Sequence, residues 1–349
     1  MKNILVTGGA GFIGSHTCLL LLEKGYNVYV LDSFTNSSSK SLEKVCEIIK
    51  LKKNNLKNQL KVFHGDIRDI NFIDNVFLEF KKNKKNIDGV IHFAGLKSVI
   101  DSLIKPLKYW EVNVKGTINL LQIMDKYNCN KLVFSSSATV YSAKGDNLLS
   151  EDSPIKPINP YGETKLTVES LLKNIAHNKD DLSFASLRYF NPIGAHSSGL
   201  IGEDPKGKPN NIFPLIINTA LGIQKELKIY GNDWPTHDGT PIRDYIHVMD
   251  LAEVHIKVLE NLYSKKNKYV NFNVGTGKGT SVLDLVKIFE RVNNVKVPYV
   301  FSDRRVGEAC YVVADNSYLA SELKFVPKKN IEEMCRDGWN WKSLNPNGF

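Results

Sequence analysis

Two residues four positions apart, Tyr161 and Lys165, have the types and spacing to carry out chemistry together. On a helix these positions lie on one face, so the phenol and the ammonium can converge on one substrate. A tyrosine in water titrates at about pH 10 and is protonated near neutrality, but a nearby lysine and a positively charged cofactor favour its phenolate. The pattern therefore predicts that Tyr161 acts as a base with help from Lys165.

A run of serines, Ser135 to Ser137, ends a predicted strand upstream of this pair. Doubly wound folds bind their ligands at the carboxyl ends of parallel strands. We therefore expect these hydroxyl groups to face the same ligand as Tyr161 and Lys165.

A glycine-rich segment at residues 7–14, TGGAGFIG, follows one predicted strand and opens a predicted helix. In that context, Gly8, Gly11 and Gly14 predict a turn whose backbone amides approach a pyrophosphate. Asp32 ends the second predicted strand, where a carboxylate accepts hydrogen bonds from ribose hydroxyls and repels a 2′-phosphate. The residues that follow it, SFTNSSS, contain no arginine to neutralise such a phosphate. The sequence therefore predicts NAD rather than NADP as the cofactor.

These side chains need a framework, and the first half of the chain supplies one by alternating short apolar runs with helix-length segments. This alternation predicts an α/β fold with a doubly wound parallel sheet, Rossmann-like, in which helices cover both faces. The expected strands are Ile4–Val6, Asn27–Asp32, Leu60–Phe63, Gly89–Phe93 and Lys131–Ser135, with a helix over Gly11–Gly25.

After about Arg188 the pattern changes, because clusters of turn-forming residues separate short apolar runs. We expect two domains: residues 1–187 as the dinucleotide-binding domain, and residues 188–349 as a smaller, loop-rich α/β substrate-binding region. A helix and a Lys/Asn-rich loop form an insert at about residues 40–60 of the first domain, and residues 339–349 are expected to fray.

The composition is that of a globular protein, with 42% hydrophobic and 24% charged residues among 349. The net charge of +9 suggests a polyanionic partner, but the basic excess is concentrated between Lys40 and Lys85 and only seven of the 46 basic residues are arginine. Phosphate- and base-reading surfaces favour arginine. Nucleic-acid binding is therefore not expected, and the lysines are interpreted as solvated surface.

The five cysteines are scattered and no pair has CxxC spacing, which favours free thiols in a reducing compartment. None of the histidines has metal-ligand spacing, so no metal site is expected. The chain shows neither a signal peptide nor an apolar run long enough to span a membrane. We expect a soluble, cytoplasmic protein.

Several longer motifs resemble the extended short-chain dehydrogenase/reductase family, and most closely its sugar-nucleotide 4-epimerases. They are TGGAGFIG, HFAGLKSV, NVKGT, FSSSATVY, NPYGETK, RYFNPIGAH, PNN and RDYIHVMDLA. The resemblance runs from about Lys2 to the end and is interrupted mainly near residues 40–60. It implies reversible 4-epimerisation of UDP-glucose and UDP-galactose through a 4-keto intermediate, with NAD bound tightly. It also implies a homodimer, formed through helices near Leu107–Tyr127 and Tyr161–Ala176.

The resemblance also assigns roles to single residues. Tyr161 is the catalytic base, Lys165 assists it and holds the nicotinamide ribose, and Ser137 bridges Tyr161 and the sugar O4. The residues implied to bind NAD are Gly8, Gly11, Phe12, Ile13, Gly14, Asp32, Asn36, Asp66, Ile67, Phe93, Ala94, Lys97, Asn113, Ser135, Tyr161, Lys165 and Tyr189.

By the same resemblance, the second half binds the UDP-hexose. Asn191 and Asn211 are implied to contact the phosphates, and Arg243 and Arg305 the pyrophosphate, for which a guanidinium fork is suited. The full set of residues implied to bind substrate is Ser137, Tyr161, Phe190, Asn191, Asn211, Ile212, Tyr230, Arg243, Tyr245, Arg305 and Glu308.

Two positions depart from the family pattern. Glu308 stands where an aspartate usually contacts the uridine ribose, and it is longer by one methylene. Val312 stands at the position that gates N-acetylated sugars, where a tyrosine excludes them and a small residue admits them. Activity on UDP-GlcNAc and UDP-GalNAc is left open.

The same residues bear on other functions. A 4,6-dehydratase on this scaffold usually has Thr-Asp-Glu where this chain has Ser136-Ser137-Ala138, and a decarboxylase needs a site for a sugar carboxylate, which is not evident. A non-catalytic dinucleotide-sensing protein tends to lose the Tyr/Lys pair that this chain retains. A nucleic-acid binder would depend on the lysine-rich insert.

Overall fold

A computed structural model describes residues 1–52, 60–142, 145, 147–207, 209–264, 268–305 and 307–349. The chain divides into two compact units, and it crosses between them more than once. The first unit comprises Met1–Val140, Pro157–Arg188 and Ala252–Phe272. The second comprises Tyr141–Lys156, Tyr189–Leu251 and Asn273–Phe349. The single domain boundary between residues 187 and 188 therefore stays a prediction from the sequence.

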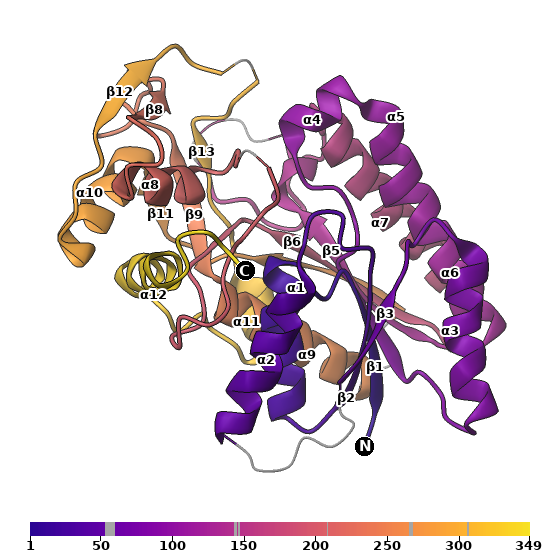
Figure 1. The fold of residues 1–349 in the computed structure, drawn as a ribbon. Helices are drawn as coiled ribbons and strands as arrows, with labels where there is room; N and C mark the ends of the chain where they lie inside the picture. The colour runs from indigo at the N-terminus through magenta and orange to yellow at the C-terminus, as the bar shows by residue number, and fades with distance from the viewer. Residues whose placement is uncertain (53–59, 143–144, 146, 208, 265–267, 306) are drawn as a thin grey trace. The chain divides into compact units, whose positions relative to one another are not determined.

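A seven-stranded sheet organises the first unit, in the order β10-β6-β5-β4-β1-β2-β3 (Figure 1). The pairs β1–β2, β2–β3, β1–β4 and β4–β5 are parallel. The strand order reverses beside β1, as it does in doubly wound folds, which confirms the predicted fold class. The strands are β1 (Asn3–Thr7), β2 (Asn27–Asp32), β3 (Leu60–His64), β4 (Gly89–His92), β5 (Lys131–Ser137), β6 (Ser183–Tyr189) and β10 (Tyr269–Val274).

Helices cover both faces of this sheet (Figure 1). One face carries α1 (Phe12–Glu23), α2 (Ser39–Lys52) and α9 (Val248–Ser264), and the other carries α3 (Ile70–Lys82), α6 (Gly116–Lys126) and α7 (Pro160–Asn178). The π-helix η1 (Trp110–Lys115) leads into α6 and follows α4 (Val99–Ile104) and α5 (Pro106–Tyr109). The predicted helix of the insert is thus confirmed as α2, whereas residues 53–59 of its Lys/Asn-rich loop lie outside the described residues.

The sequence of α3 shows how these helices attach to the sheet. The carboxylate of Asp69 caps its first turn by accepting a hydrogen bond from the Phe72 amide at 3.0 Å. Buried side chains then recur at a spacing of three or four residues and form one apolar stripe. They are Ile73, Val76, Phe77 and Phe80, and they join the core cluster that includes Leu5, Leu31 and Val90 of the sheet.

Shorter strands and helices build the second unit. β9 (Ile242–His247) pairs with β7 (Asn191–Ile193) and β13 (Tyr311–Val312) in parallel and with β11 (Gly279–Ser281) antiparallel. β8 (Leu227–Tyr230) pairs in parallel with β12 (Tyr299–Ser302). The helices are α8 (Ile212–Ala220), α10 (Val282–Asn293), α11 (Ser317–Leu323) and α12 (Ile331–Leu344).

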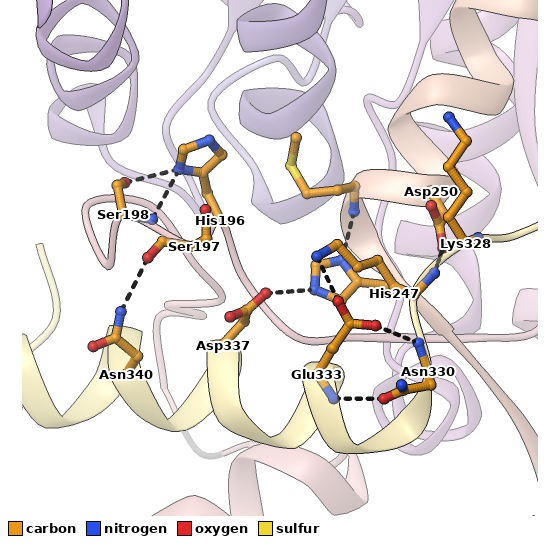
Figure 2. A network of polar contacts seen from close by, with 12 residues as sticks. His196, Ser197, Ser198, His247, Asp250, Lys328, Asn330, Glu333, Asp337 and Asn340 are labelled. Atoms are coloured by element: carbon orange, nitrogen blue, oxygen red, sulfur yellow. Dashed lines mark hydrogen bonds and ion pairs between the residues drawn. The ribbon is translucent and has the colours of Figure 1, made fainter.

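A polar network attaches α12 to the rest of the second unit (Figure 2). The buried His247 lies 3.2 Å from the Asp337 carboxylate through Nε2, while its Nδ1 accepts the Met249 amide at 3.1 Å. At the start of the helix, Asn330 and Glu333 form a reciprocal capping box. Both ring nitrogens of His247 thus make contacts within the second unit, which is typical of a structural histidine.

The end of the chain is packed, which corrects the expectation that residues 339–349 fray. Trp341 is only 2% exposed, and the ring of Phe349 lies 4.6 Å from its ring. The Phe349 amide donates to the Asp204 carboxylate at 2.9 Å. Aromatic burial outweighs the disorder that Asn, Pro and Gly favour in a terminal segment. Among the described residues, no helix is long and apolar enough to cross a membrane.

Candidate active site

The glycine-rich turn between β1 and α1 is closed so tightly that side chains do not fit at two of its glycines. Gly8 has a φ of +69°, and a Cβ there would lie 2.7 Å from the Ala94 backbone nitrogen. A Cβ on Gly14 would lie 2.4 Å from the Gly8 carbonyl oxygen. Gly11 is the N-cap of α1 and makes no side-chain capping bond. The turn thus leaves the helix N-terminus accessible to an anion, which is the fit that a dinucleotide pyrophosphate requires.

Asp32 lies beside this turn at the end of β2 and is 7% exposed. Its Oδ2 accepts the Ala10 amide at 2.9 Å, and its Oδ1 accepts the Phe34 amide and the Ser37 hydroxyl at 2.9 Å each. A carboxylate has about four acceptor positions, so these contacts leave about one for a ribose hydroxyl. Asp32 therefore holds the turn in shape as well as offering an acceptor.

The adenine contact at Asp66 and Ile67 stays a prediction, and the structure shows the surroundings of both residues. The carboxylate of Asp66 pairs with Arg68 at 2.8 Å, and this hydrogen-bonded guanidinium lowers the pKa of Asp66. Ile67 is buried and faces Gly116. Arg68 is thus a competitor for the Asp66 side chain that the sequence pattern did not reveal. Of the other predicted cofactor residues in this unit, Asn36 and Lys97 are exposed.

A buried polar chain supports the segment after β4. The Thr7 hydroxyl lies 2.6 Å from Nδ1 of His92, whose Nε2 lies 2.9 Å from the Thr117 hydroxyl. Burial, assisted by the charge of Lys165, lowers the pKa of His92 to about 3, so this ring is neutral. Asn113, in the π-helix, accepts the Leu96 amide at 2.8 Å. Phe93 and Ala94 are held as well, because both of their amides donate to the Thr7 carbonyl.

The structure brings Tyr161, Lys165 and the end of β5 together. Asn159 caps α7 by accepting the Gly162 amide at 2.8 Å, which places Tyr161 in the first turn. The Tyr161 hydroxyl is hydrogen-bonded to Ser137. The Lys165 ammonium donates to the Ser135 carbonyl at 2.6 Å and lies 5.7 Å from the centre of the Tyr161 ring. The predicted set of tyrosine, lysine and serine is therefore one cluster.

The electrostatics of this cluster show what ionisation of Tyr161 requires. Burial raises the pKa of Tyr161 to about 12, against the lowering effect of its hydrogen bond with Ser137. Burial also lowers the pKa of Lys165 to about 8, and the charge of Glu169 opposes that shift. The prediction named Lys165 and a positively charged cofactor as the two groups that favour the phenolate, and desolvation explains why the lysine alone does not suffice. A further positive charge beside Tyr161 is needed.

In the second unit, several predicted substrate residues meet around β9. Arg243 donates to Oε1 of Glu308 at 2.9 Å. Oε2 of Glu308 and the hydroxyl of Tyr245 are buried, and each lacks a hydrogen-bond partner among the described residues. Buried polar atoms of this kind are rare in folded proteins unless something else satisfies them. They mark this face of β9 as a site for a polar ligand.

Neighbouring residues extend this face. Asn191 and Val312 flank β9 in register, opposite Tyr245 and Arg243 respectively. The guanidinium of Arg305 lies 3.9 Å above the ring of Tyr230.

The N-terminus of α8 is available in the same unit. Asn211 is its N-cap residue, but the Asn211 side chain makes no capping bond. Ile212 follows as the first helical residue. Tyr189 and Phe190, which are predicted to bind cofactor and substrate respectively, are both buried. The Phe190 amide donates to the Val274 carbonyl at 3.1 Å.

A family model described as "NAD dependent epimerase/dehydratase family" matches residues 4–275. The chain belongs to this family. It is 47% identical to the UDP-glucose 4-epimerase of Bacillus subtilis (strain 168), over 99% of this chain and 98% of the relative. It is 48% identical to UDP-glucose 4-epimerase 2 of Arabidopsis thaliana, over 100% of this chain and 97% of that protein.

Solved structures of similar proteins agree with this membership. One is UDP-glucose-4-epimerase from Stenotrophomonas maltophila with bound NAD and formylated UDP-arabinopyranose, with a TM-score of 0.92 at 41% identity over 99% of this chain and 98% of that one. Another is UDP-glucose 4-epimerase from Bifidobacterium longum with NAD+ and UDP, with a TM-score of 0.91 at 42% identity over the whole of both chains.

As a member of the NAD dependent epimerase/dehydratase family, the chain has a cofactor half whose geometry fits a dinucleotide. The closed glycine turn, the uncapped start of α1 and the acceptor Asp32 provide for a pyrophosphate and a ribose. Sequence reasoning missed Glu169, which is buried and accepts a hydrogen bond from the Ser136 hydroxyl. The signal for Glu169 was its position four residues after Lys165, on the same helix face.

Proposed function

We propose that this protein interconverts UDP-glucose and UDP-galactose by reversible epimerisation at C4, through a 4-keto intermediate and with tightly bound NAD. The observation that carries the proposal is the cluster of Tyr161, Lys165 and Ser137 in a member of this family. A phenol with a bridging hydroxyl and a fixed ammonium is suited to moving one proton at a sugar hydroxyl.

In this mechanism Tyr161 takes the proton of the sugar 4-hydroxyl and later returns it, and Ser137 bridges the two oxygens. When bound, NAD supplies a reversible hydride acceptor for C4 and a positive ring that favours the Tyr161 phenolate. The glycine turn and Asp32 hold the dinucleotide. Lys165, whose ammonium donates to the Ser135 carbonyl, would bind the nicotinamide ribose.

Inversion at C4 requires that the ketose can present either face to the same groups, so the UDP portion must be the anchor. Arg243 and Arg305 supply guanidinium groups for the pyrophosphate, and the start of α8 at Asn211 supplies backbone amides. Glu308 offers its partnerless oxygen to a ribose hydroxyl. The Arg305 guanidinium lies 3.9 Å above the Tyr230 ring, so these two side chains would meet the nucleotide together.

Incubation of the purified protein with UDP-galactose, followed by chromatography of the nucleotide sugars, tests this proposal. We expect UDP-glucose to form without added NAD, and the denatured protein to release NAD. A 4-keto-6-deoxy product would instead indicate a dehydratase, although Ser136, Ser137 and Ala138 provide no acidic residue at the position where dehydratases carry one. Absence of any product contradicts the proposal.

We also propose that the protein forms a homodimer through the helices near Leu107–Tyr127 and Tyr161–Ala176 together with the α4–α5 region that precedes them. Large apolar side chains there are exposed: Ile100 at 44%, Leu103 at 61%, Ile104 at 68% and Leu107 at 83%. Adjacent exposed apolar side chains of this kind are typical of an interface. Light scattering of the protein and of a Leu103→Glu/Leu107→Glu variant tests this: the variant should be monomeric, and a monomeric parent contradicts the proposal.

A further inference from the structure

Two consecutive arginines after β12 each lie over an aromatic ring at or just after the end of β8. The guanidinium carbon of Arg304 lies 3.9 Å from the centre of the Trp234 ring, and that of Arg305 lies 3.9 Å from the centre of the Tyr230 ring. Arg305 and Tyr230 belong to the predicted substrate site, whereas Arg304 and Trp234 do not. The second cation–π pair therefore has no part in the proposed function as it stands.

Arg304 makes three contacts with two consecutive residues. Its Nε donates to Oδ1 of Asp233 at 2.7 Å, and its Nη2 donates to the backbone carbonyl of Asp233 at 2.6 Å. The ring of Trp234 provides the third contact. The Asp233 side chain is 67% exposed, and an exposed ion pair alone contributes little. The carbonyl and the ring make this attachment stronger, because both suit the planar guanidinium fork.

These contacts extend the pairing of two strands. The register of β8 and β12 ends at Tyr230 and Ser302, and the Gly231 amide then donates to the Ser302 carbonyl at 2.7 Å. Gly231 has a φ of +82°, and a Cβ there would lie 2.4 Å from Nε1 of Trp234 and 3.0 Å from Cγ of Arg304. The close approach at Gly231 therefore fixes where Trp234 and Arg304 lie relative to the strand ends.

A turn that follows Arg304 carries two groups of the proposed substrate site. The Arg305 carbonyl accepts the Glu308 amide at 3.2 Å. The far end of this turn is attached to β9, because the Glu308 carboxylate accepts Arg243 at 2.9 Å. The near end is attached through Arg304. Loss of the Arg304 contacts would release the near end of the turn while its far end stays attached.

We propose that Arg304, held by Asp233 and Trp234, is a positioning residue for nucleotide binding: it fixes the backbone at Arg305, so that the Arg305 guanidinium is in place before the pyrophosphate arrives. This role rests on the proposed function, in which Arg305 binds the pyrophosphate. Ordering one long side chain during binding weakens affinity by about twofold to tenfold. A turn that is already ordered avoids that loss. The fork of Arg304 is occupied by Asp233, which leaves Arg305 as the phosphate ligand of the pair.

A general attraction between the charge of Arg304 and the phosphates is the alternative explanation. Asp233→Ala separates the two, because it removes the carboxylate anchor and raises the net positive charge nearby. Positioning predicts that this variant binds UDP less tightly than the parent, and attraction predicts binding at least as tight. Arg304→Lys separates them as well, since lysine keeps the charge but lacks the planar fork.

Isothermal titration of the full-length protein with UDP measures Kd, and steady-state kinetics with UDP-galactose measure KM and kcat. We expect Kd to rise by about threefold to tenfold in Arg304→Gln and Arg304→Lys, and by about twofold to fivefold in Asp233→Ala. The double variant Asp233→Ala/Arg304→Gln should bind no more weakly than Arg304→Gln, because both changes remove one contact. KM should follow Kd, and kcat should stay at the parent's value.

Two further variants serve as controls. Trp234→Phe keeps a ring for the Arg304 guanidinium and should stay within about twofold of the parent's Kd. Arg291→Gln breaks an exposed ion pair with Glu332 in the same unit and should bind UDP as the parent does.

The outcomes separate the inference from the proposed function. If folded Arg304→Gln binds UDP as tightly as the parent, or Asp233→Ala binds it more tightly, the inference is wrong. A merely structural role would lower the thermal unfolding midpoint and leave Kd of the folded protein unchanged. If the variants weaken UDP binding but the parent does not convert UDP-galactose, the proposed function fails and the positioning by Arg304 stands. A parent that does not bind UDP contradicts both.

Discussion

Arg243 donates to Oε1 of Glu308 at 2.9 Å and leaves the second carboxylate oxygen buried without a hydrogen-bond partner among the described residues. The pair therefore presents one guanidinium and one free acceptor on the face of β9. In the proposed site the acceptor takes a ribose hydroxyl while the guanidinium binds phosphate. We therefore expect the Arg243–Glu308 pair to affect substrate binding and not the rate of the chemical step.

Replacement of Glu308 by alanine should therefore raise KM for UDP-galactose by about 10-fold to 100-fold, because a charge-assisted hydrogen bond is lost and Arg243 is freed to move. We expect kcat to change by less than about threefold. Steady-state kinetics measure both values. Glu332→Ala, which breaks an exposed ion pair with Arg291 in the same unit, is the matched control. A fall in kcat at constant KM would contradict the assignment of Glu308 to binding.

Tyr161→Phe should lower kcat by about 10²-fold to 10⁴-fold, because it removes the group that moves the proton. Cofactor retention should persist, since the glycine turn, Asp32 and Lys165 remain. Turnover of UDP-galactose and the NAD released on denaturation are measured on the same sample. Tyr127→Phe, near the end of α6, is the control. Normal turnover by Tyr161→Phe would mean that another residue is the base.

Asp32→Asn tests whether this carboxylate both holds the glycine turn and accepts a ribose hydroxyl. The amide keeps one acceptor oxygen but cannot accept from Ala10, Phe34 and Ser37 together with a ribose. We expect NAD to be lost on gel filtration and the free energy of unfolding to fall by about 1–3 kcal/mol. Ser37→Ala removes one of the three contacts and should retain NAD. Unchanged NAD content in Asp32→Asn would exclude the ribose contact.

Val312, which lies opposite Arg243 on the paired strands, should admit N-acetylated sugars at the gating position that the family resemblance implies, because its side chain is smaller than tyrosine. We expect measurable turnover of UDP-GalNAc. Val312→Tyr should reduce it by at least about tenfold relative to UDP-galactose, through steric exclusion. Chromatography of both reactions gives the ratio. Equal ratios in the two proteins would show that Val312 does not set the specificity.

The parts of this structure that follow from local patterns could be predicted from sequence. β2 runs over Asn27–Asp32 as expected, because its apolar run has sharp polar boundaries. The glycine turn was recognisable because a strand and a helix flank it. The pairing of Tyr161 and Lys165 could be predicted because residues four positions apart lie on one face of a helix.

What the sequence did not reveal depends on tertiary contacts. Arg188 and Glu169 are 19 residues apart and come from different elements, so their pairing has no local signal. The effect of burial on the pKa of Tyr161 could not be predicted, because burial depends on the packed protein and not on neighbouring residues alone. The order at Phe349 likewise comes from Trp341 and Asp204, which its own segment does not predict.

His92 should make the protein sensitive to acid. Its pKa in the folded state is lowered to about 3, mainly by burial, whereas an unfolded histidine titrates at about 6.5. The unfolded state therefore binds more protons between these values, so stability is present in full above about pH 6.5 and is lost as pH falls towards 3. For one such group the loss between pH 7 and pH 5 is about 2 kcal/mol.

Urea unfolding of the protein and of His92→Gln at pH 7 and pH 5 measures this contribution. The variant is less stable at pH 7, because Thr7 and Thr117 lose their shared partner. Its loss of stability on acidification should be smaller than the parent's by about 2 kcal/mol. His177→Gln, at an exposed position of α7, should behave as the parent does. If His92→Gln and the parent lose the same free energy between the two pH values, His92 is not the buried neutral group described.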